Sequence, residues 1–301
     1  MRIGTGGAIS TISTKKEPVL SRGGALDEAC GTMSAPVTLT PAQLSTIAVR
    51  QSKGRAGGAP GLTHLHLEER SLGAVEGLAA LVALRVLYLY ENALCSLSAL
   101  GLGGPLTHLY VSKNEVATLR GLEQCASLQK IYADENAVRH VDGLEMLRGV
   151  EELHLSRQAA PAEGAAGPPV DGSQVLELGG GFSVCPHTIV ALSASLRVLG
   201  LAGNGITRPS CLRVLSRCEQ LDLADNAIED MEELQIMIAG MESMTTLKVA
   251  RNPLCSRRKY AESLIVASVS ITTIDELVVN QQQRHFLVQM EGARRRKAGG
   301  A

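Results

Sequence analysis

Aromatic residues are scarce in this chain of 301 residues, which has no Trp, two Phe and five Tyr. Long apolar stretches are missing too, because none reaches the roughly 18–20 residues that a membrane-spanning helix needs. The N-terminus lacks the continuous apolar segment of a signal peptide. The net charge is only −1 at pH 7, so nothing favours bulk binding to nucleic acid or acidic lipid. We therefore expect neither a membrane protein nor a nucleic-acid-binding protein.

Motifs that would support catalysis or a cofactor are missing as well. The seven Cys include no C-x-x-C pair, and an odd number without a secretion signal is typical of reduced intracellular thiols. Cys185 and His187 lie close together, but no second pair completes a structural zinc site. The glycines at 179–181 are not followed by the Gly-Lys-Ser/Thr of a phosphate-binding loop, and no G-x-S-x-G is present. We expect no enzyme, no cofactor and no metal site.

What the sequence does have is an internal repeat with a period of 22. Rows that start at Leu62, Leu84, Leu106, Leu128 and Val150 begin LTHLHLEERSL, LRVLYLYENAL, LTHLYVSKNEV, LQKIYADENAV and VEELHLSRQAA. The phase is lost after Gln158 and returns at Leu196 with LRVLGLAGNGI and CEQLDLADNAI, followed from Met244 by MTTLKVARNPL. Seven of these eight rows carry nearly the whole pattern L-x-x-L-x-L-x-x-N-x-L of leucine-rich repeats. The sequence thus predicts an α/β fold, a leucine-rich-repeat solenoid of about eight coils.

Each row predicts the same local structure. The alternating leucines form a short strand whose apolar side chains face inward, and the Asn that follows lies buried at the turn and bonds to backbone groups of neighbouring coils. Arg70 takes the Asn place in the first row and Gln158 takes it in the fifth. One coil cannot bury its own apolar face, so stability comes from stacking. The predicted structural asparagines are Asn92, Asn114, Asn136, Asn204, Asn226 and Asn252.

The segments outside the rows suggest how the chain is organised. Residues 1–35 have few large apolar side chains and are predicted to be disordered. Residues 36–60 are predicted to form an N-terminal capping helix, with Thr40 as N-cap and Pro41 at the first helical position, and a Gly-rich link. The solenoid spans 61–255, and residues 256–301 are expected to leave the repeat as a C-terminal cap and a helical basic tail.

An insertion at 159–195 interrupts the solenoid. Its first part is rich in Ala, Pro and Gly and should be a loop, whereas PHTIVALSAS can form a helix that begins near Pro186. The fifth row starts at Val150 and the sixth at Leu196, a step of two periods plus two. The insertion therefore either replaces the back of the fifth row or hides one degenerate coil.

The scarce tyrosines gather on one predicted surface. Within a row, the residues between the leucines face away from the core and form the concave face. One column across the strands holds His66, Tyr88, Tyr110, Tyr132 and His154, and in later rows Gly200, Asp222 and Lys248. The next column holds Glu68, Tyr90 and Asp134, and the column before it holds His64, His108, Lys130 and Glu152. Glu69, Glu91 and Glu135 add negative charge at the edge, interrupted by Lys113.

Two readings of this concave strip remain open. Tyr is a good strand former, and aromatic side chains stacked across strands stabilise one another modestly. Tyr is also enriched at protein interfaces, where it supplies a large contact area at low entropic cost. Because a scarce residue is concentrated here, we favour a protein-binding surface that is strongest in the N-terminal half. An open face without a pocket argues against a catalytic site.

Several stretches together resemble one family. LYLYENAL, LTHLYVSKNEV, the insertion after the fifth row and RNPLCSRRKYAESLIVASVSITTIDEL with RHFL look like the leucine-rich-repeat regulatory subunits of protein phosphatase 1, in particular their ciliary and centrosomal type. The resemblance covers roughly residues 36–297. It implies a non-catalytic adaptor in the cytoplasm and cytoskeleton, at the axoneme of a cilium or flagellum, the basal body or the centrosome. The phosphatase catalytic subunit would lie against Tyr88, Tyr90, Glu91, Tyr110, Tyr132, Asp134 and Glu135.

A second function remains open beside the regulatory subunit. The solenoid could be a structural component of the ciliary axoneme, bound to tubulin or to dynein-arm proteins. Residues 1–35 and the basic RRRK at 294–297 would then supply extra contacts, although we favour a solvated helix end as the explanation of RRRK.

Overall fold

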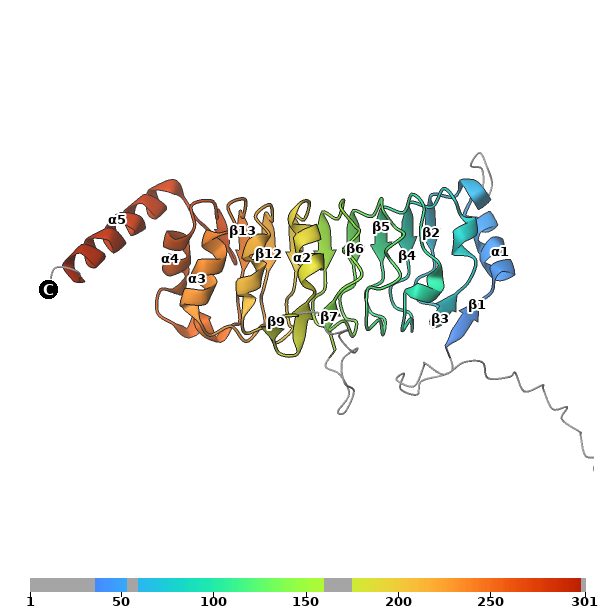
Figure 1. Cartoon of the computed structure of the whole chain (residues 1–301), viewed down its shortest axis with the longest axis horizontal. Coiled ribbons are helices and arrows are strands. Elements are labelled where there is room, and N and C mark those ends of the chain that lie inside the picture. Colours follow the sequence, from blue (N-terminus) through green and yellow to red (C-terminus); the bar gives the residue numbers. More distant parts are fainter. Residues whose placement is uncertain (1–35, 53–58, 160–174, 299–301) are drawn as a thin grey trace, which may run out of the picture. The chain divides into compact units, whose positions relative to one another are not determined.

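The computed structural model of the chain describes residues 36–52, 59–159 and 175–298 (Figure 1). The predicted disorder of residues 1–35, most of the Gly-rich link and the Ala/Pro/Gly-rich part of the insertion lie outside the described residues. All described residues belong to one unit, Thr32–Ala301. The following description concerns that unit.

A parallel sheet built from the repeats runs through the described chain (Figure 1). Its strands pair in the order β15-β14-β13-β12-β11-β8-β6-β5-β4-β2, and all pairs are parallel except β14 with β15. Neighbouring rows pair without a shift, so that Tyr88 lies opposite Tyr110 and Tyr110 opposite Tyr132. The strands are β2 (His64–His66), β4 (Val86–Tyr88), β5 (His108–Tyr110), β6 (Lys130–Tyr132), β8 (Glu152–His154), β11 (Val198–Gly200), β12 (Gln220–Asp222), β13 (Thr246–Lys248), β14 (Thr273–Ile274) and β15 (Leu277–Val278).

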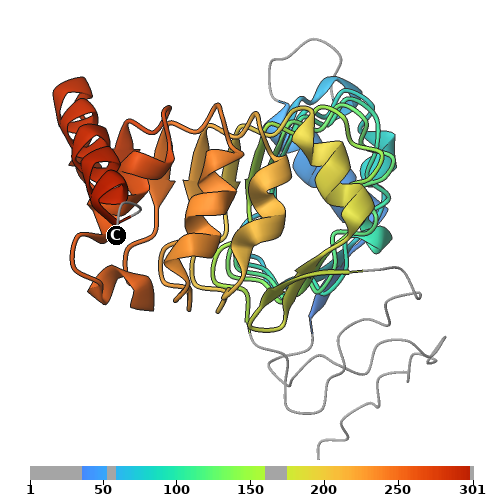
Figure 2. The same ribbon diagram turned by 60° about the vertical axis from the view of Figure 1, so that its left-hand side comes forward.

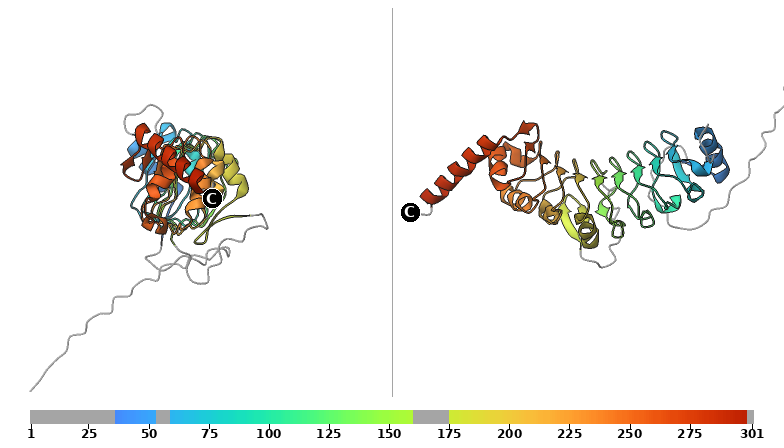
Figure 3. Two further views of the ribbon diagram at one scale, coloured as in Figure 1. Left: turned by 90° about the vertical axis from the view of Figure 1, so that its left-hand side faces the viewer. Right: turned by 90° about the horizontal axis from the view of Figure 1, so that it is seen from above.

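The apolar core lies behind this sheet. The central residue of each strand points into it, and Leu65, Leu87, Leu109 and Ile131 are fully buried. The return segments close the core from the other side as short helical turns or helices, and Figures 2 and 3 show the helices following one another along that side of the sheet. These elements are η2 (Leu78–Ala80), η3 (Ser98–Leu100), α2 (Pro186–Ser193), η4 (Pro209–Val214), α3 (Met231–Ala239), η5 (Pro253–Ser256) and α4 (Tyr260–Ala267). Two further elements are not return segments: η1 (Ala59–Gly61) comes before β2, and α5 (Gln281–Ala298) is the C-terminal helix that follows β15.

Asparagine side chains tie the coils together at the turn after each strand. Asn226 shows the arrangement: its Oδ1 accepts from the backbone N–H of Asn204 at 2.9 Å and Ile206 at 3.0 Å, and its Nδ2 donates to the carbonyls of Leu201 and Leu223, both at 3.0 Å. These partners belong to its own coil and the one before. A buried backbone polar group must be paired, and one amide side chain satisfies four of them. Asn114, Asn136, Asn204 and Asn252 are buried in the same way, and Asn92 is half-buried.

In the two rows that lack this asparagine, other side chains pair with the backbone groups of the turn. Gln158 in the fifth row keeps the pattern, because its Oε1 accepts from the N–H of Val138 at 2.9 Å and its Nε2 donates to the carbonyl of Ala133 at 2.9 Å. Arg70 in the first row is exposed. Its backbone N–H instead donates to Asn92 Oδ1 at 3.0 Å. The asparagine of the second row, Asn92, therefore accepts the hydrogen bond from the backbone of the first turn.

The N-terminal helix α1 (Pro41–Gln51) begins where the sequence predicts. The Thr40 hydroxyl accepts from the N–H of Gln43, and the Gln43 side chain accepts from the N–H of Thr40 at 3.0 Å, which completes a capping box. Leu44 and Ala48 are buried against the core. Gln51 bonds to both backbone groups of His66, which joins the helix to the first strand of the repeats.

Replacing Thr40 with Ala should destabilise the chain by about 1 kcal/mol, because the first turn of α1 loses its side-chain acceptor. Urea unfolding followed by circular dichroism measures the change. Thr46 is the matched control, since its hydroxyl bonds only to the carbonyl of Ala42 within the same helix, and alanine there should be neutral or slightly stabilising. Equal losses at the two positions would contradict the capping role.

The described part of the insertion, residues 175–195, contributes no strand to the main sheet. Strands β8 and β11 pair directly, with Leu153 opposite Leu199, so the prediction of a hidden coil is wrong and the alternative, replacement of the back of the fifth row, is correct. The helix expected near Pro186 is present as α2. Sequence reasoning missed a small second sheet in which β9 (Leu176–Gly179) pairs antiparallel with β10 (Phe182–Val184), and β10 pairs parallel with β7 (His140–Val141).

The glycines at 179–181 form the turn between β9 and β10. All three have positive φ, at 90°, 61° and 74°, a conformation that costs a side-chain-bearing residue energy. A Cβ on Gly180 would also lie 2.3 Å from the carbonyl oxygen of Gly205. This run therefore allows the hairpin to approach the next coil closely.

At the N-terminal and C-terminal ends, the chain adds strands that the repeat pattern does not contain. Strand β1 (Val37–Leu39) pairs parallel with β3 (Leu72–Val75). Beyond residue 255, where the sequence predicted that the chain leaves the repeat, β14 still pairs parallel with β13, with Leu247 opposite Ile274. The row that contains β14, ITTIDELVVN from Ile271, has Glu276 and Val279 where the pattern has Leu and Asn, so it does not appear in the repeat pattern. Among the described helices, none combines the length and apolar character that crossing a membrane requires.

Candidate functional site

Five aromatic rings stack in one column across the face of the main sheet that points away from the core. They are His66, Tyr88, Tyr110, Tyr132 and His154, one from each of β2, β4, β5, β6 and β8. Successive ring centroids lie 4.4, 4.8, 4.7 and 4.7 Å apart, with interplanar angles between 3° and 15°. We call these five residues the aromatic column.

The register of the strands produces this column. Parallel strands lie about 4.8 Å apart, so rings that project from equivalent positions of successive strands meet at nearly that spacing. Offset stacking of aromatic rings is favourable by about 0.5–1.5 kcal/mol per pair. The three tyrosines are half-buried by their neighbours and keep the rest of their surface open to solvent. The rings are thus already stacked in the chain without a partner.

A charged pair supports the C-terminal part of the column. Lys130 Nζ lies 2.6 Å from Glu152 Oε1, and the Tyr132 hydroxyl donates to Glu152 Oε2 at 2.7 Å. Burial alone would raise the pKa of Glu152, but the hydrogen bonds from Lys130 and Tyr132 outweigh it and the pKa is lowered. Burial and the hydrogen bond to Glu152 raise the pKa of Tyr132. These contacts hold the Tyr132 ring in position and keep it neutral.

The neighbouring column of predicted site residues is built around polar contacts. Asp134 Oδ1 accepts from the N–H of Ser156 at 2.6 Å, which fixes the turn of the next row. Glu68 Oε1 lies 3.2 Å from His66 Nδ1. Partial burial raises the pKa of Tyr90, and the nearby charge of Glu68 raises it further. Tyr90 therefore adds a fourth half-buried phenol beside the aromatic column.

The edge of this surface is less acidic than the sequence suggested. Glu91 and Glu135 are exposed at turn positions with φ of 56°, but each pairs with a cation of the following row. Lys113 Nζ lies 2.5 Å from Glu91, and Arg157 Nη1 lies 3.3 Å from Glu135. Side chains one period apart stand side by side, so these charges neutralise one another. Exposed pairs of this kind contribute at most about 1 kcal/mol to stability.

Three of the described cysteine thiols, those of Cys125, Cys211 and Cys218, are poor nucleophiles. Burial raises the pKa of Cys125 and Cys211 to about 11 and that of Cys218 to about 12. Cys185 Sγ lies 4.0 Å from His187 Nδ1, but no group of three or more potential metal ligands occurs within residues 36–52, 59–159 and 175–298.

These thiols should be slow to react in the folded protein. At pH 8 a thiol with a pKa of about 11 is ionised to only about one part in a thousand, and the thiolate is the reactive form. We expect iodoacetamide to leave Cys125 and Cys218 unmodified in the native chain and to modify both in urea, as read by peptide mass spectrometry. Labelling of native Cys218 at the rate of a free peptide thiol would contradict the burial.

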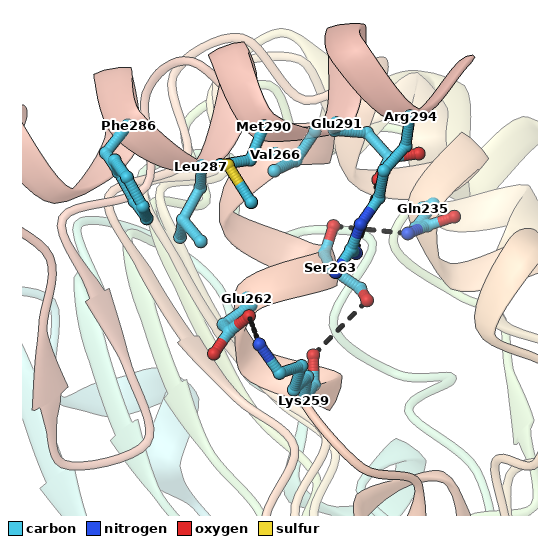
Figure 4. A pocket seen from close by; sticks show the side chains of 10 residues that line it. All are labelled: Gln235, Lys259, Glu262, Ser263, Val266, Phe286, Leu287, Met290, Glu291 and Arg294. Carbon is cyan, nitrogen blue, oxygen red and sulfur yellow. Dashed lines mark hydrogen bonds and ion pairs between the residues drawn. The ribbon is translucent and has the colours of Figure 1, made fainter. Parts of the chain in front are cut away.

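A separate cavity of about 270 Å³ lies between α4 and α5, away from the aromatic column (Figure 4). Figure 4 shows the side chains of Phe286, Leu287 and Met290 from α5 on one side, opposite the ion pair of Lys259 and Glu262, whose atoms lie 3.0 Å apart. Its lining mixes apolar and charged side chains of both signs. Sequence reasoning did not single out this cavity, because it depends on how α5 packs.

No protein-family model matches the chain. Among solved structures, the chain is similar to internalin C2 of Listeria monocytogenes, with 18% identity and a TM-score of 0.50, covering 76% of this chain and 92% of that one. It also matches internalin F of the same organism, with 15% identity and a TM-score of 0.40, covering 82% and 79% respectively. Internalins are leucine-rich-repeat proteins. The likeness to internalin C2, together with the long parallel sheet and its helices, shows that the chain has an α/β leucine-rich-repeat fold.

Proposed function

We propose that this protein is a non-catalytic adaptor that binds another protein on the concave face of its main sheet. The observation that carries the proposal is the aromatic column, which together with Tyr90 gathers four of the five tyrosines on one half-exposed surface. Glu91, Asp134 and Glu135 border that surface.

The physical argument rests on preorganisation. Tyr combines a large apolar ring with a hydroxyl that can donate or accept, and such residues dominate the energy of many interfaces. Rings that are already stacked lose little further freedom on binding, so less of the interaction energy is spent on ordering side chains. An open face that cannot exclude water suits binding better than catalysis.

We infer further that the partner is the catalytic subunit of protein phosphatase 1, with this chain as a regulatory or targeting subunit. This part rests on the sequence resemblance to the leucine-rich-repeat regulators, from which we also infer a place at cilia, basal bodies or centrosomal microtubules. The eight repeats between the two helical ends would form the binding surface. Most contacts with the partner would lie in the N-terminal half of the repeats.

The test is a calorimetric titration of the full chain with purified protein phosphatase 1 catalytic subunit, beside the same titration with tubulin dimer. We expect saturable binding of the phosphatase, micromolar or tighter, and none of tubulin. Absence of any heat with a chain shown to be folded would overturn the phosphatase assignment, and binding of tubulin alone would favour the structural role.

One observation favours a structural component of the axoneme as the second candidate. Helix α5 leaves Phe286, Val288 and Met290 exposed, with 61%, 48% and 44% of their surface accessible, and an adaptor that uses only its concave face would not need them. The structural role predicts that the protein stays with axonemes after salt and detergent extraction, and full release would exclude it.

A further inference from the structure

The aromatic column ends because the next strand carries no side chain at the equivalent position. Gly200 of β11 lies directly beside His154 of β8, and Asp222 of β12 follows. A Cβ on Gly200 would lie 3.0 Å from His154 Nδ1 and 3.3 Å from Ser156 Oγ. The first five rows thus fill this line of the concave face with rings. In the sixth row the line continues over the buried backbone of Gly200, beside which the His154 ring and the Ser156 hydroxyl lie.

A hollow of about 110 Å³ opens here, and Gly200 is among the residues that line it. We call it the Gly200 slot, and its lining includes His154, Ser156, Asp222, Thr246 and Lys248. From β8 to β12 the sheet covers two strand spacings, about 9.6 Å. One ring placed 4.4–4.8 Å from His154, the spacing of the existing column, would stand over β11, midway to Asp222.

The far side of the slot offers a polar partner for such a ring. Asp222 is half-buried, its Oδ1 accepts from the N–H of Ala224 at 3.0 Å and its Oδ2 lies 3.3 Å from Lys248 Nζ. A carboxylate accepts up to about four hydrogen bonds, so Asp222 retains capacity for a further donor. A phenol O–H or an indole N–H at the outer end of a ring is a donor of that kind.

We propose that the Gly200 slot receives one aromatic side chain of the partner protein, a tyrosine or a tryptophan, which stacks on His154 as the sixth ring and donates to Asp222. The proposal rests on the proposed function, because it places an anchor of the partner on the same concave face. It extends the binding surface beyond the N-terminal half, to a position that itself contributes no side chain.

The test uses a small probe, so that it does not depend on which protein the partner is. The full chain is titrated with N-acetyl-tyrosinamide while the imidazole signals of its seven histidines are followed by NMR, with His154 assigned from a His154→Gln variant. Ring stacking should shift the His154 signal upfield, saturating in the millimolar range, while His285 on α5 stays unchanged. N-acetyl-alaninamide should shift nothing.

A glycine variant then locates the binding. Gly200→Leu should fill the slot and weaken probe binding at least about tenfold, which corresponds to about 1.4 kcal/mol. The matched control is Gly292→Leu on α5, where an added Cβ meets nothing within 4 Å, and it should bind like wild type. If Gly200→Leu does not fold, the wild-type titration still decides, with Gly200→Ala as a milder second variant expected to weaken binding by a smaller factor.

Three outcomes would overturn the proposal. They are no selective shift of His154, the same shift with the alanine amide, and a stronger response to N-acetyl-argininamide, which would assign the slot to a guanidinium instead. A failed probe titration together with phosphatase binding would remove the slot and leave the proposed function standing. A successful probe titration without phosphatase binding would support the Gly200 slot and overturn the phosphatase assignment.

Discussion

Replacing Tyr88, Tyr110 and Tyr132 together with alanine should weaken binding of the protein partner at least about 100-fold. Interface tyrosines commonly contribute about 2 kcal/mol or more each when truncated, and the loss of three neighbouring rings would remove the centre of the proposed surface. Calorimetric titration with the phosphatase catalytic subunit measures the effect.

Two control proteins separate lost contacts from lost stability. The alanine variant gives up the stacking that the rings provide within the sheet, about 0.5–1.5 kcal/mol per pair, so its fold must be checked by urea unfolding. The triple Tyr→Phe variant keeps the stacking and should bind within about tenfold of wild type. Alanine at Val82, Val190 and Ile236, three exposed apolar side chains on the return segments, should not affect binding. A folded triple-alanine variant with wild-type affinity would remove the aromatic column from the site.

Asn226→Ala should destabilise the fold by about 3–5 kcal/mol, which is an exceptional loss for one substitution. The change leaves the buried N–H groups of Asn204 and Ile206 without an acceptor. The carbonyls of Leu201 and Leu223 lose one donor each but keep another, from Asn204 and Asn252. Each unsatisfied group costs about 1–3 kcal/mol, and partial relaxation or water entry would recover some of the total. Urea unfolding monitored by circular dichroism gives the difference.

Asn280 is the matched control for that experiment. It is exposed, and its Oδ1 accepts a single hydrogen bond, from the N–H of Gln283 at 2.6 Å near the start of α5. Asn280→Ala should therefore cost about 1 kcal/mol or less. Comparable losses for the two asparagines would contradict the account of the buried amides as the links between coils.

The sequence predicts the repeated part of this fold well, because a fixed period converts one-dimensional spacing into neighbours in space. The rows, the inward leucines and the alignment of Tyr88 with Tyr110 all follow from that constant period. Strand β14 was missed because its row has Glu276 and Val279 at the positions of the consensus Leu and Asn. The hairpin of β9 and β10 was missed because its strands are short and its Gly-rich turn reads as a loop.

The candidate site, too, could be predicted from the sequence only in part. Its residues could be placed in columns from the period alone, but the interactions between columns could not. The pairing of Arg157 with Glu135 neutralises an edge that appeared acidic, and it depends on side-chain reach across the turn. The hollow at Gly200 depends on a ring on one strand and an empty position on the next. Such features require the coordinates of neighbouring rows.

The most direct test of the central claim, that the tyrosine-lined concave face binds the partner, uses the tyrosines themselves as probes. Fluorotyrosine incorporation gives one fluorine NMR signal for each of the five tyrosines, and Tyr260 on α4 lies outside the concave face, with its hydroxyl 3.1 Å from Asp275. On saturation with the phosphatase catalytic subunit, we predict that the signals of Tyr88, Tyr90, Tyr110 and Tyr132 shift or broaden while that of Tyr260 stays in place. A complex that forms by calorimetry but leaves those four signals unchanged would contradict the account.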